Sequence, residues 1–145
     1  MSGERNGVEE REDGLRTGGD VRLVVPAAPE YLRLVRLTAA GLASRLGFTF
    51  DEVEDLRIAV DELCFHLLGE ADNGHDGSAD PRTMDLTYSA GADSITITGL
   101  TGLNGPIPEP SELSKQILDA LVDEHEVGGG DDGMVRFRLT KQRES

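Results

Sequence analysis

Few residues of this sequence have the types and spacing that carry catalysis. The histidines His66, His75 and His125 are not paired with another His or Cys at the spacing of a metal site, and Cys64 is the single cysteine. The sequence contains neither a P-loop nor a nucleophile elbow. Acids follow the glycine run at 128–130 and oppose phosphate binding, so a hairpin turn is the better interpretation. We therefore expect structural or surface roles for the histidines.

The charge of the chain restricts its partners. The 145 residues include 28 Asp and Glu against 14 Lys and Arg, which gives a formal net charge of -14. This charge repels nucleic-acid phosphates and anionic lipids, and it favours encounter with basic proteins. The sequence has neither a run long enough to span a membrane nor an apolar stretch near its start. We expect a cytoplasmic protein that contacts neither nucleic acid nor membrane directly.

The pattern of apolar residues predicts one domain at 21–140, between an acidic, glycine-rich disordered tail at 1–20 and a polar tail at 141–145. A strand is expected at 21–25 and a helix at 30–46. The inward positions expected for this helix are Tyr31, Leu34, Val35, Thr38, Leu42 and Leu46. A capping box of Thr49 and Glu52 then predicts the start of a second helix, which should end at Gly69.

The second half of the chain predicts a hairpin and a closing helix. Alternating residues at 83–88 and 94–98 indicate two strands, and Ser111 should cap a helix reaching about Val122 with Leu113, Ile117, Leu118 and Leu121 inward. Strands at 124–127 and 135–140 complete the order β-α-α-β-β-α-β-β. This order favours an α+β fold, a two-layer sandwich with a mixed or antiparallel sheet and helices on one face.

One long segment carries a family resemblance. Val24 to Val60 contains a P-A-x-P-E-Y entry, R-L-T in the first helix and G-x-x-x-D-E-V-E-D-L-R-I-A-V before the second apolar half-helix. This segment resembles the N-terminal half of the anti-sigma factor and serine-protein kinase family, the RsbW-like branch of the GHKL ATPases. Leu118 to Thr140 is similar to the closing helix and strands of that family.

The resemblance implies a Bergerat-type fold and a protein that is a homodimer when free. Such a protein sequesters a sigma subunit of RNA polymerase, and an anti-anti-sigma protein of the STAS type competes for it. Active members bind ATP with magnesium and phosphorylate that antagonist on serine. The exposed face of the first helix is the docking surface in this family, which places Glu30, Arg33 and Arg36 at the partner. A solvated face with intrahelical ion pairs is the alternative.

The nucleotide motifs of the family are altered. Glu62 occupies the first place of the E-x-x-x-N-A-x-x-H box, but His66, Leu67 and Glu70 replace its Asn, Ala and final His. Magnesium prefers oxygen ligands to an imidazole. Glu62 and His66 are therefore interpreted as remnants of a lost site, Glu62 as a vestigial catalytic acid and His66 as a residue at a collapsed pocket.

Two further nucleotide elements are missing. The family's adenine-binding Asp follows the third strand, where this chain has Gly99 to Gly102, and no Asp lies between Asp93 and Asp119. The glycine-rich lid of the family is replaced by a glycine-free, acidic junction at 109–114. Gly99, Thr101 and Asn104 are accordingly assigned with His66 to a vestigial pocket. We expect no ATP or magnesium cofactor and no metal site.

Three functions remain open. The leading hypothesis is an anti-sigma factor that acts by stoichiometric sequestration, released by a STAS-type antagonist through partner switching. The second is an ATP-dependent serine kinase of that antagonist with a remodelled site. The third is a binding module whose pocket takes another small molecule, lined by Thr98, Thr101, Asn104 and His66.

Overall fold

The elements of the chain follow the predicted order. The computed structural model describes residues 20–73, 82–102, 110–129 and 133–144, without the side chains of 66–73. Its elements are β1 (Val21–Pro26), the 3-10 turn η1 (Pro29–Tyr31), α2 (Leu32–Arg45), α3 (Phe50–Asn73), β2 (Thr83–Ala90), β3 (Ser94–Gly102), α4 (Glu112–Leu121), β4 (Glu124–Gly129) and β5 (Met134–Gln142). Apart from the short η1, this is the order β-α-α-β-β-α-β-β.

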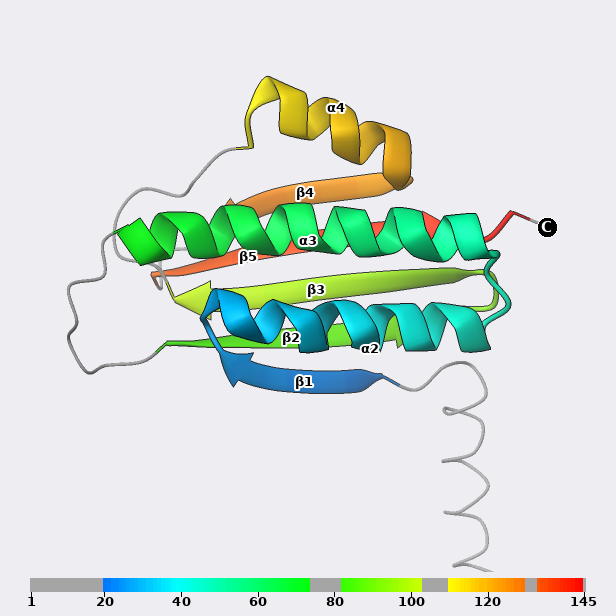
Figure 1. The fold of residues 1–145 in the computed structure, drawn as a ribbon, viewed down its shortest axis with the longest axis horizontal. Coiled ribbons are helices and arrows are strands. Elements are labelled where there is room, and N and C mark those ends of the chain that lie inside the picture. Colours follow the sequence, from blue (N-terminus) through cyan, green and yellow to red (C-terminus); the bar gives the residue numbers. More distant parts are fainter. Residues whose placement is uncertain (1–19, 74–81, 103–109, 130–132, 145) are drawn as a thin grey trace, which may run out of the picture.

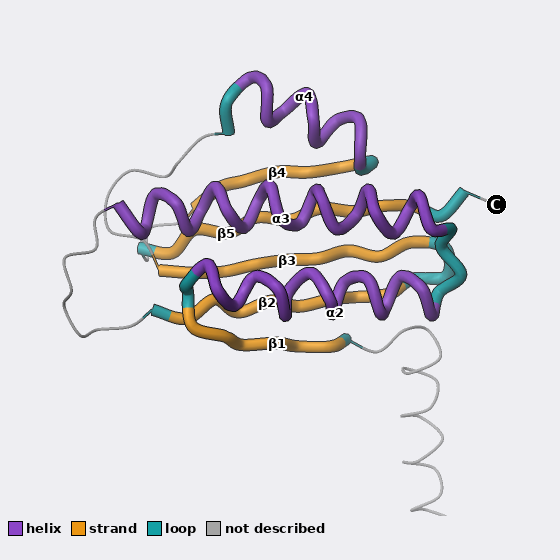
Figure 2. The backbone as a smooth tube through the Cα atoms, in the orientation of Figure 1, coloured by secondary structure: helices purple, strands orange, loops and turns teal. Residues whose placement is uncertain are grey.

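The strands form one antiparallel sheet in the order β1-β2-β3-β5-β4. Figure 1 shows α2 and α3 side by side across one face of this sheet, with α4 beside α3 on the β4 side. The same two layers are visible in Figure 2, where the helices lie in front of the strands. The predicted α+β two-layer fold is therefore confirmed, and its sheet is antiparallel.

The core lies between the two layers and is mostly aliphatic. Each strand sends alternate residues toward the helices, as the pleat requires. The largest side chains that are fully buried are Tyr88, Phe137, Leu56, Leu63, Met84, Leu86, Ile95, Ile97, Leu118 and Leu139. Tyr88 also fixes α2 on the sheet, because its hydroxyl donates to the Val35 carbonyl at 3.0 Å. This bond positions the turn of α2 that carries the next residue, Arg36.

The buried face of α2 differs from the prediction. Leu32, Val35, Ala39 and Ala43 are buried, whereas Leu34, predicted to point inward, is 47% exposed. The small alanines make the contact with the rest of the core, so that the helix and its neighbours approach closely. The larger leucines at 34 and 37 are left on the outside.

Several element ends also differ from the sequence prediction. The α3 helix continues past Gly69 to Asn73, and β5 runs to Gln142, two residues beyond the boundary expected at 140. Lys141 is buried at that end of the strand. In α4 the predicted Ser111 cap is confirmed, because its hydroxyl accepts the Ser114 N–H at 3.0 Å. Leu113, expected to point inward, is 66% exposed.

Glu52 joins the start of α3 to the end of the chain. One carboxylate oxygen accepts the Thr49 N–H at 2.7 Å, and Thr49 Oγ1 accepts the Glu52 N–H at 3.1 Å. The other oxygen accepts the Glu144 N–H at 2.7 Å. The bonds from Thr49 and then Glu144 hold the pKa of Glu52 below its ordinary value. The predicted capping box is confirmed, and it has a second function as an anchor for the C-terminal segment.

This anchor predicts a loss of stability in acid. A carboxyl whose pKa is lower in the folded state stabilises the fold above its unfolded pKa of about 4.3, and that contribution is lost as the pH falls through the folded pKa. Glu52→Gln should lower the free energy of unfolding by about 1 kcal/mol at neutral pH. It should also flatten the pH dependence of stability below about pH 5. Urea unfolding followed by circular dichroism across this pH range measures both effects.

Glu112 supplies the control for this prediction, because it is exposed on α4. Glu112→Gln should leave both the stability at neutral pH and its dependence on pH within a few tenths of a kcal/mol, roughly 0.5 at most. If stability falls equally steeply in acid for Glu52→Gln and for the unchanged chain, the Glu52 carboxylate is not the group that stabilises the fold.

Candidate functional site

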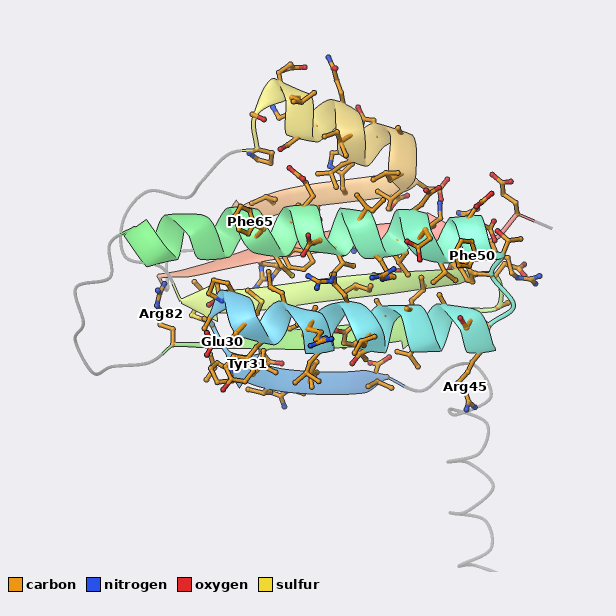
Figure 3. All side chains as sticks on the ribbon, in the orientation of Figure 1. Glu30, Tyr31, Arg45, Phe50, Phe65 and Arg82 are labelled. Carbon is orange, nitrogen blue, oxygen red and sulfur yellow. The ribbon has the colours of Figure 1, made fainter. Side chains whose placement is uncertain are left out.

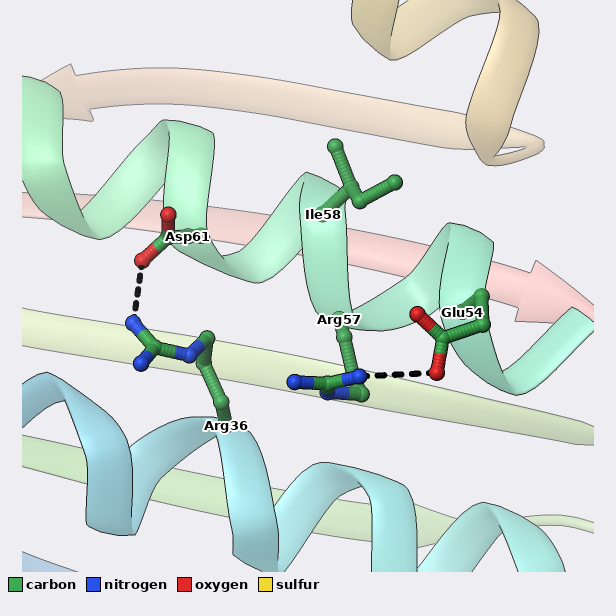
Figure 4. A pocket seen from close by; sticks show the side chains of 5 residues that line it. All are labelled: Arg36, Glu54, Arg57, Ile58 and Asp61. Carbon is green, nitrogen blue, oxygen red and sulfur yellow. Dashed lines mark hydrogen bonds and ion pairs between the residues drawn. The ribbon is translucent and has the colours of Figure 1, made fainter.

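The outer surface of the helical layer contains a groove between α2 and α3. It has a volume of about 320 Å³ and is lined by Arg36, Glu54, Arg57, Ile58 and Asp61. Figure 4 shows Arg36 reaching from α2 toward Asp61 on α3, and Arg57 lying beside Glu54. The groove therefore presents two guanidinium groups and two carboxylates to the solvent.

An ion pair between the two helices closes part of this groove. Arg36 Nη1 donates to Asp61 Oδ1 at 2.7 Å, and the two side chains keep 31% and 45% of their exposure. Within α3, Arg57 Nη1 donates to Glu54 Oε2 at 2.7 Å. Exposed pairs of this kind contribute only about 0.2–1 kcal/mol. A partner that offers a better-placed carboxylate can therefore take the place of Asp61 at little cost.

One donor in the groove has no acceptor. Among the residues that the structure describes, Arg57 Nε is buried and makes no hydrogen bond. A buried donor without a partner is unfavourable. The chemistry of the groove is thus recognition through charged hydrogen bonds. Its lining holds no cysteine, histidine, serine or lysine that could act as a nucleophile or proton shuttle.

The three predicted partner residues do not share one face. Glu30 lies in η1 and Arg33 in the first turn of α2, and both are exposed. Arg36 lies at the edge of the buried face and points toward α3, because the buried stripe runs through Val35 and Ala39 rather than Leu34. The expectation that Arg36 lies on the exposed face of the helix with Glu30 and Arg33 is therefore wrong. The pair that Arg36 forms joins two helices, whereas the alternative had been an intrahelical pair.

Asp61 and the Glu54–Arg57 pair were not predicted as part of the site. Glu54 and Arg57 are separated by three positions, a helical spacing that brings opposite charges together and could have been recognised. Asp61 is 25 residues from Arg36 in the chain, and only the packing of α2 on α3 makes them neighbours. No local pattern in the sequence reveals that contact.

Two of the residues assigned to a vestigial pocket, Gly99 and Thr101, lie elsewhere, at the end of β3. Gly99 and Thr101 are both buried and face the helices. The Phe137 ring fills the space over Gly99, where a Cβ atom would overlap Cε2 of the ring and lie 2.8 Å from Cζ. The Thr101 hydroxyl donates to the Thr83 carbonyl at 3.0 Å. Asn104 and the side chain of His66 lie outside the described residues.

Thr98 does not line this region. It lies between Thr87 and Arg138 in the sheet and points to the face without helices, whereas Thr101 points to the helices. Adjacent odd and even positions of a strand face opposite sides, so Thr98 and Thr101 cannot line one pocket. The four-residue lining expected for a small-molecule pocket is therefore wrong in this chain.

The Glu62 carboxylate is occupied by a hydrogen bond from α4. The Ser114 hydroxyl, in the first turn of α4, donates to Glu62 Oε2. At the other end of α4, Lys141 Nζ donates to the Leu121 carbonyl at 2.7 Å and lies 3.9 Å from Asp55. These two contacts hold α4 against α3. The carboxylate that could have been a catalytic base thus accepts a hydrogen bond from a serine of this chain.

Cys64 has no accessible chemistry. It is fully buried in α3, and burial raises the pKa of its thiol. The described part of the chain contains no group of three or more His, Cys, Asp or Glu side chains that could hold a metal ion. Within the same described ranges, no helix is both long and apolar enough to cross a membrane.

Comparisons with known proteins connect this geometry to a family. No family model matches the chain. Curated proteins named serine-protein kinase RsbW do match: the one from Bacillus pumilus is 46% identical over 57 residues, and the one from Bacillus subtilis 51% over 51 residues. The chain resembles the RsbW serine-protein kinases. The RsbW kinase of Halalkalibacterium halodurans is 38% identical over 77 residues, which are 53% of this chain.

The match to RsbW kinases is partial in length. The aligned residues are 35% of the Bacillus pumilus protein, 32% of the Bacillus subtilis protein and 44% of the Halalkalibacterium halodurans protein. A crystal structure of the RsbU and RsbW domains of a Mycobacterium tuberculosis protein has a TM-score of 0.62 and covers 86% of this chain and 32% of that one. At 14% identity this second likeness shows the fold alone.

Proposed function

We propose that this protein is an anti-sigma factor that sequesters a sigma subunit of RNA polymerase by binding and without phosphoryl transfer. A STAS-type anti-anti-sigma protein releases the sigma subunit by competing for the chain. The similarity to RsbW kinases at 38–51% identity is the observation that carries this proposal. The free protein is a cytoplasmic homodimer that contacts neither nucleic acid nor membrane.

The α2 surface is the proposed partner site. Glu30 and Arg33 are exposed on the first turns, and Arg36 opens toward the groove with Arg57 beside it. A partner carboxylate that pairs with Arg36 replaces Asp61, and the weak exposed pair opposes this exchange little. Partner switching then requires only a difference in affinity, at about 1.4 kcal/mol for each tenfold preference.

The region where ATP would be expected supports a binding function over a kinase function. The Phe137 ring occupies the space over Gly99, and the Glu62 carboxylate accepts the Ser114 hydroxyl. The strand end that carries the adenine-binding Asp in the family offers Gly99 and Thr101, whose hydroxyl is already engaged with Thr83. These residues do not fit a nucleotide with magnesium, so the proposed mechanism has no step through ATP.

A tagged pull-down from extract of the native organism, with mass spectrometry, tests the partner assignment. We expect a sigma subunit of RNA polymerase or a STAS-domain protein among the proteins recovered at stoichiometric amounts. A matched bait with Leu34→Glu and Arg33→Glu changes the exposed face of α2 without touching its buried residues, and it should recover neither. Recovery of other proteins alone, or equal recovery by both baits, would contradict the proposal.

Calorimetry with ATP and magnesium separates sequestration from the kinase alternative. The proposal requires no heat of binding with magnesium present, and no transfer of label from γ-labelled ATP to the recovered STAS protein. Transfer of label to a serine of that protein would replace the proposal with the kinase alternative. Because Glu62 is the vestigial catalytic candidate, loss of such transfer in Glu62→Gln would then assign the base.

A further inference from the structure

We propose that a second surface, formed by α3 and α4, binds a basic amphipathic helix of a partner protein. This surface, here called the acidic face, consists of the apolar Ile58, Phe65 and Leu113 and the acids Asp55, Glu62 and Glu112. It adjoins the α2 groove, which Ile58 also lines. It goes beyond the proposed function, because its chemistry calls for a partner segment of positive charge.

The three apolar side chains of the acidic face are exposed to solvent. Ile58 is 49% exposed, Phe65 60% and Leu113 66%. Ile58 and Phe65 are two turns apart on the outer side of α3, as seven positions place them. Leu113 precedes Ser114, whose hydroxyl donates to Glu62 midway between Ile58 and Phe65 in the sequence. The Ser114–Glu62 hydrogen bond therefore joins the parts of α3 and α4 that carry these side chains.

The charge around these side chains is negative. Asp55 and Glu62 share the side of α3 that carries Ile58 and Phe65, whereas Arg57, the single base of residues 50–65, lines the α2 groove together with Glu54 and Asp61. Asp55 keeps 41% of its side-chain exposure and Glu112 is exposed on the first turn of α4. Lys115 follows Leu113 by two positions and so points to the opposite side of α4. Apolar anchors with an acidic border fit the apolar stripe and flanking lysines or arginines of a basic helix.

The same charges exclude other occupants of the acidic face. The N-terminal residues 1–19 contain five acids against three arginines, so this segment would be repelled. A second copy related by a two-fold axis would place Asp55, Glu62 and Glu112 against the same acids of its partner. Anionic lipid is repelled for the same reason.

A fluorescent 18-residue peptide of lysine and leucine, designed as an amphipathic helix, serves as the probe. We expect it to bind the full chain, with an affinity that falls steeply as salt is raised. A peptide of the same leucine pattern with glutamate in place of lysine should not bind. Fluorescence anisotropy measures both affinities, and binding of the glutamate peptide as tightly as the lysine peptide would overturn the proposal.

Matched variants locate the binding on the protein. Phe65→Ser and Leu113→Ser each remove an anchor and should weaken binding about tenfold. Phe50→Ser is the control, because Phe50 is 77% exposed at the opposite end of α3, as Figure 3 shows, and it should change the affinity less than about twofold. Equal losses for Phe50→Ser and Phe65→Ser would overturn the assignment to the acidic face.

A charge reversal covers the case in which an anchor variant does not fold. Glu112→Lys changes an exposed side chain on α4 and leaves the packing of α3 untouched. It should weaken binding of the lysine peptide by about fivefold and reduce the salt dependence. Unchanged affinity in this variant would overturn the proposal. Loss of sigma or STAS binding by α2 variants leaves all these measurements unaffected, so the two proposals fail independently.

Discussion

Replacing Phe137 with alanine is expected to lower the free energy of unfolding by about 3–5 kcal/mol. Phe137 is fully buried in β5, which lies between β3 and β4, and it is paired with Gly99 of β3. Its ring is so close that a Cβ atom at Gly99 would overlap Cε2 and lie 2.8 Å from Cζ. Removal of the ring leaves a cavity that rigid strands on both sides cannot close. Urea unfolding followed by circular dichroism measures the loss.

The reciprocal change tests whether the ring occupies that space. Gly99→Ala places a methyl group against the ring, and overpacking of this kind typically costs about 1–3 kcal/mol. In a Phe137→Leu background the same change should cost clearly less, since leucine has no atoms at the positions of Cε2 and Cζ. A double-mutant cycle gives the coupling directly. If Gly99→Ala is neutral in the unchanged chain, the ring does not fill the space over Gly99.

The coupling between Gly99 and Phe137 also bears on whether the chain binds a nucleotide. In the family that the chain resembles, the end of this strand contributes to the nucleotide site, and the proposal assigns the chain a binding role without ATP. A strong coupling between Gly99 and Phe137 means that the glycine is required for packing of the core. The presence of glycine there is then explained without a ligand.

Much of the fold follows from local signals in the sequence. The Thr49–Glu52 capping box sets the start of α3 by satisfying backbone N–H groups that only local residues can reach. Ser111 does the same for α4. Alternation of apolar residues predicts the hairpin of β2 and β3, because the pleat has a period of two. These features depend on neighbours within a few residues, which the sequence displays directly.

The errors arise where packing decides between similar local choices. The α2 sequence is apolar at Leu32, Leu34, Val35 and Leu37, so either of two stripes satisfies a helical period. Close packing against the core favours the stripe with Ala39 and Ala43. Gly69 does not end α3, because nothing local forces a helix to stop at glycine.

The candidate site was only partly predictable for the same reason. Arg36 was recognised from the resemblance, but its partner Asp61 belongs to the next helix and was not. The rotation of α2 that buries Val35 and Ala39 turns Arg36 toward α3. The neighbours of Arg36 therefore depend on how α2 packs against α3, which the sequence does not show. The error in the apolar stripe and the error about Arg36 therefore have one cause.

Replacing Arg36 with glutamate is expected to weaken binding of the recovered sigma or STAS partner by about thirtyfold, because arginines buried at interfaces often contribute about 2 kcal/mol or more. The same change places a second carboxylate against Asp61, so the chain itself should lose up to about 1 kcal/mol of stability. Calorimetric titration and thermal unfolding measure the two effects separately.

The double variant Arg36→Glu with Asp61→Arg distinguishes recognition from structural support. It restores an interhelical ion pair with reversed direction, so stability should return to that of the unchanged chain. Partner binding should stay weak, because the guanidinium now projects from α3 and the carboxylate from α2. If the double variant binds as well as the unchanged chain, Arg36 acts only by holding α2 on α3, and the docking surface must lie elsewhere. Asp61→Ala completes the set: this change removes the carboxylate that competes for Arg36, so the partner should bind more tightly.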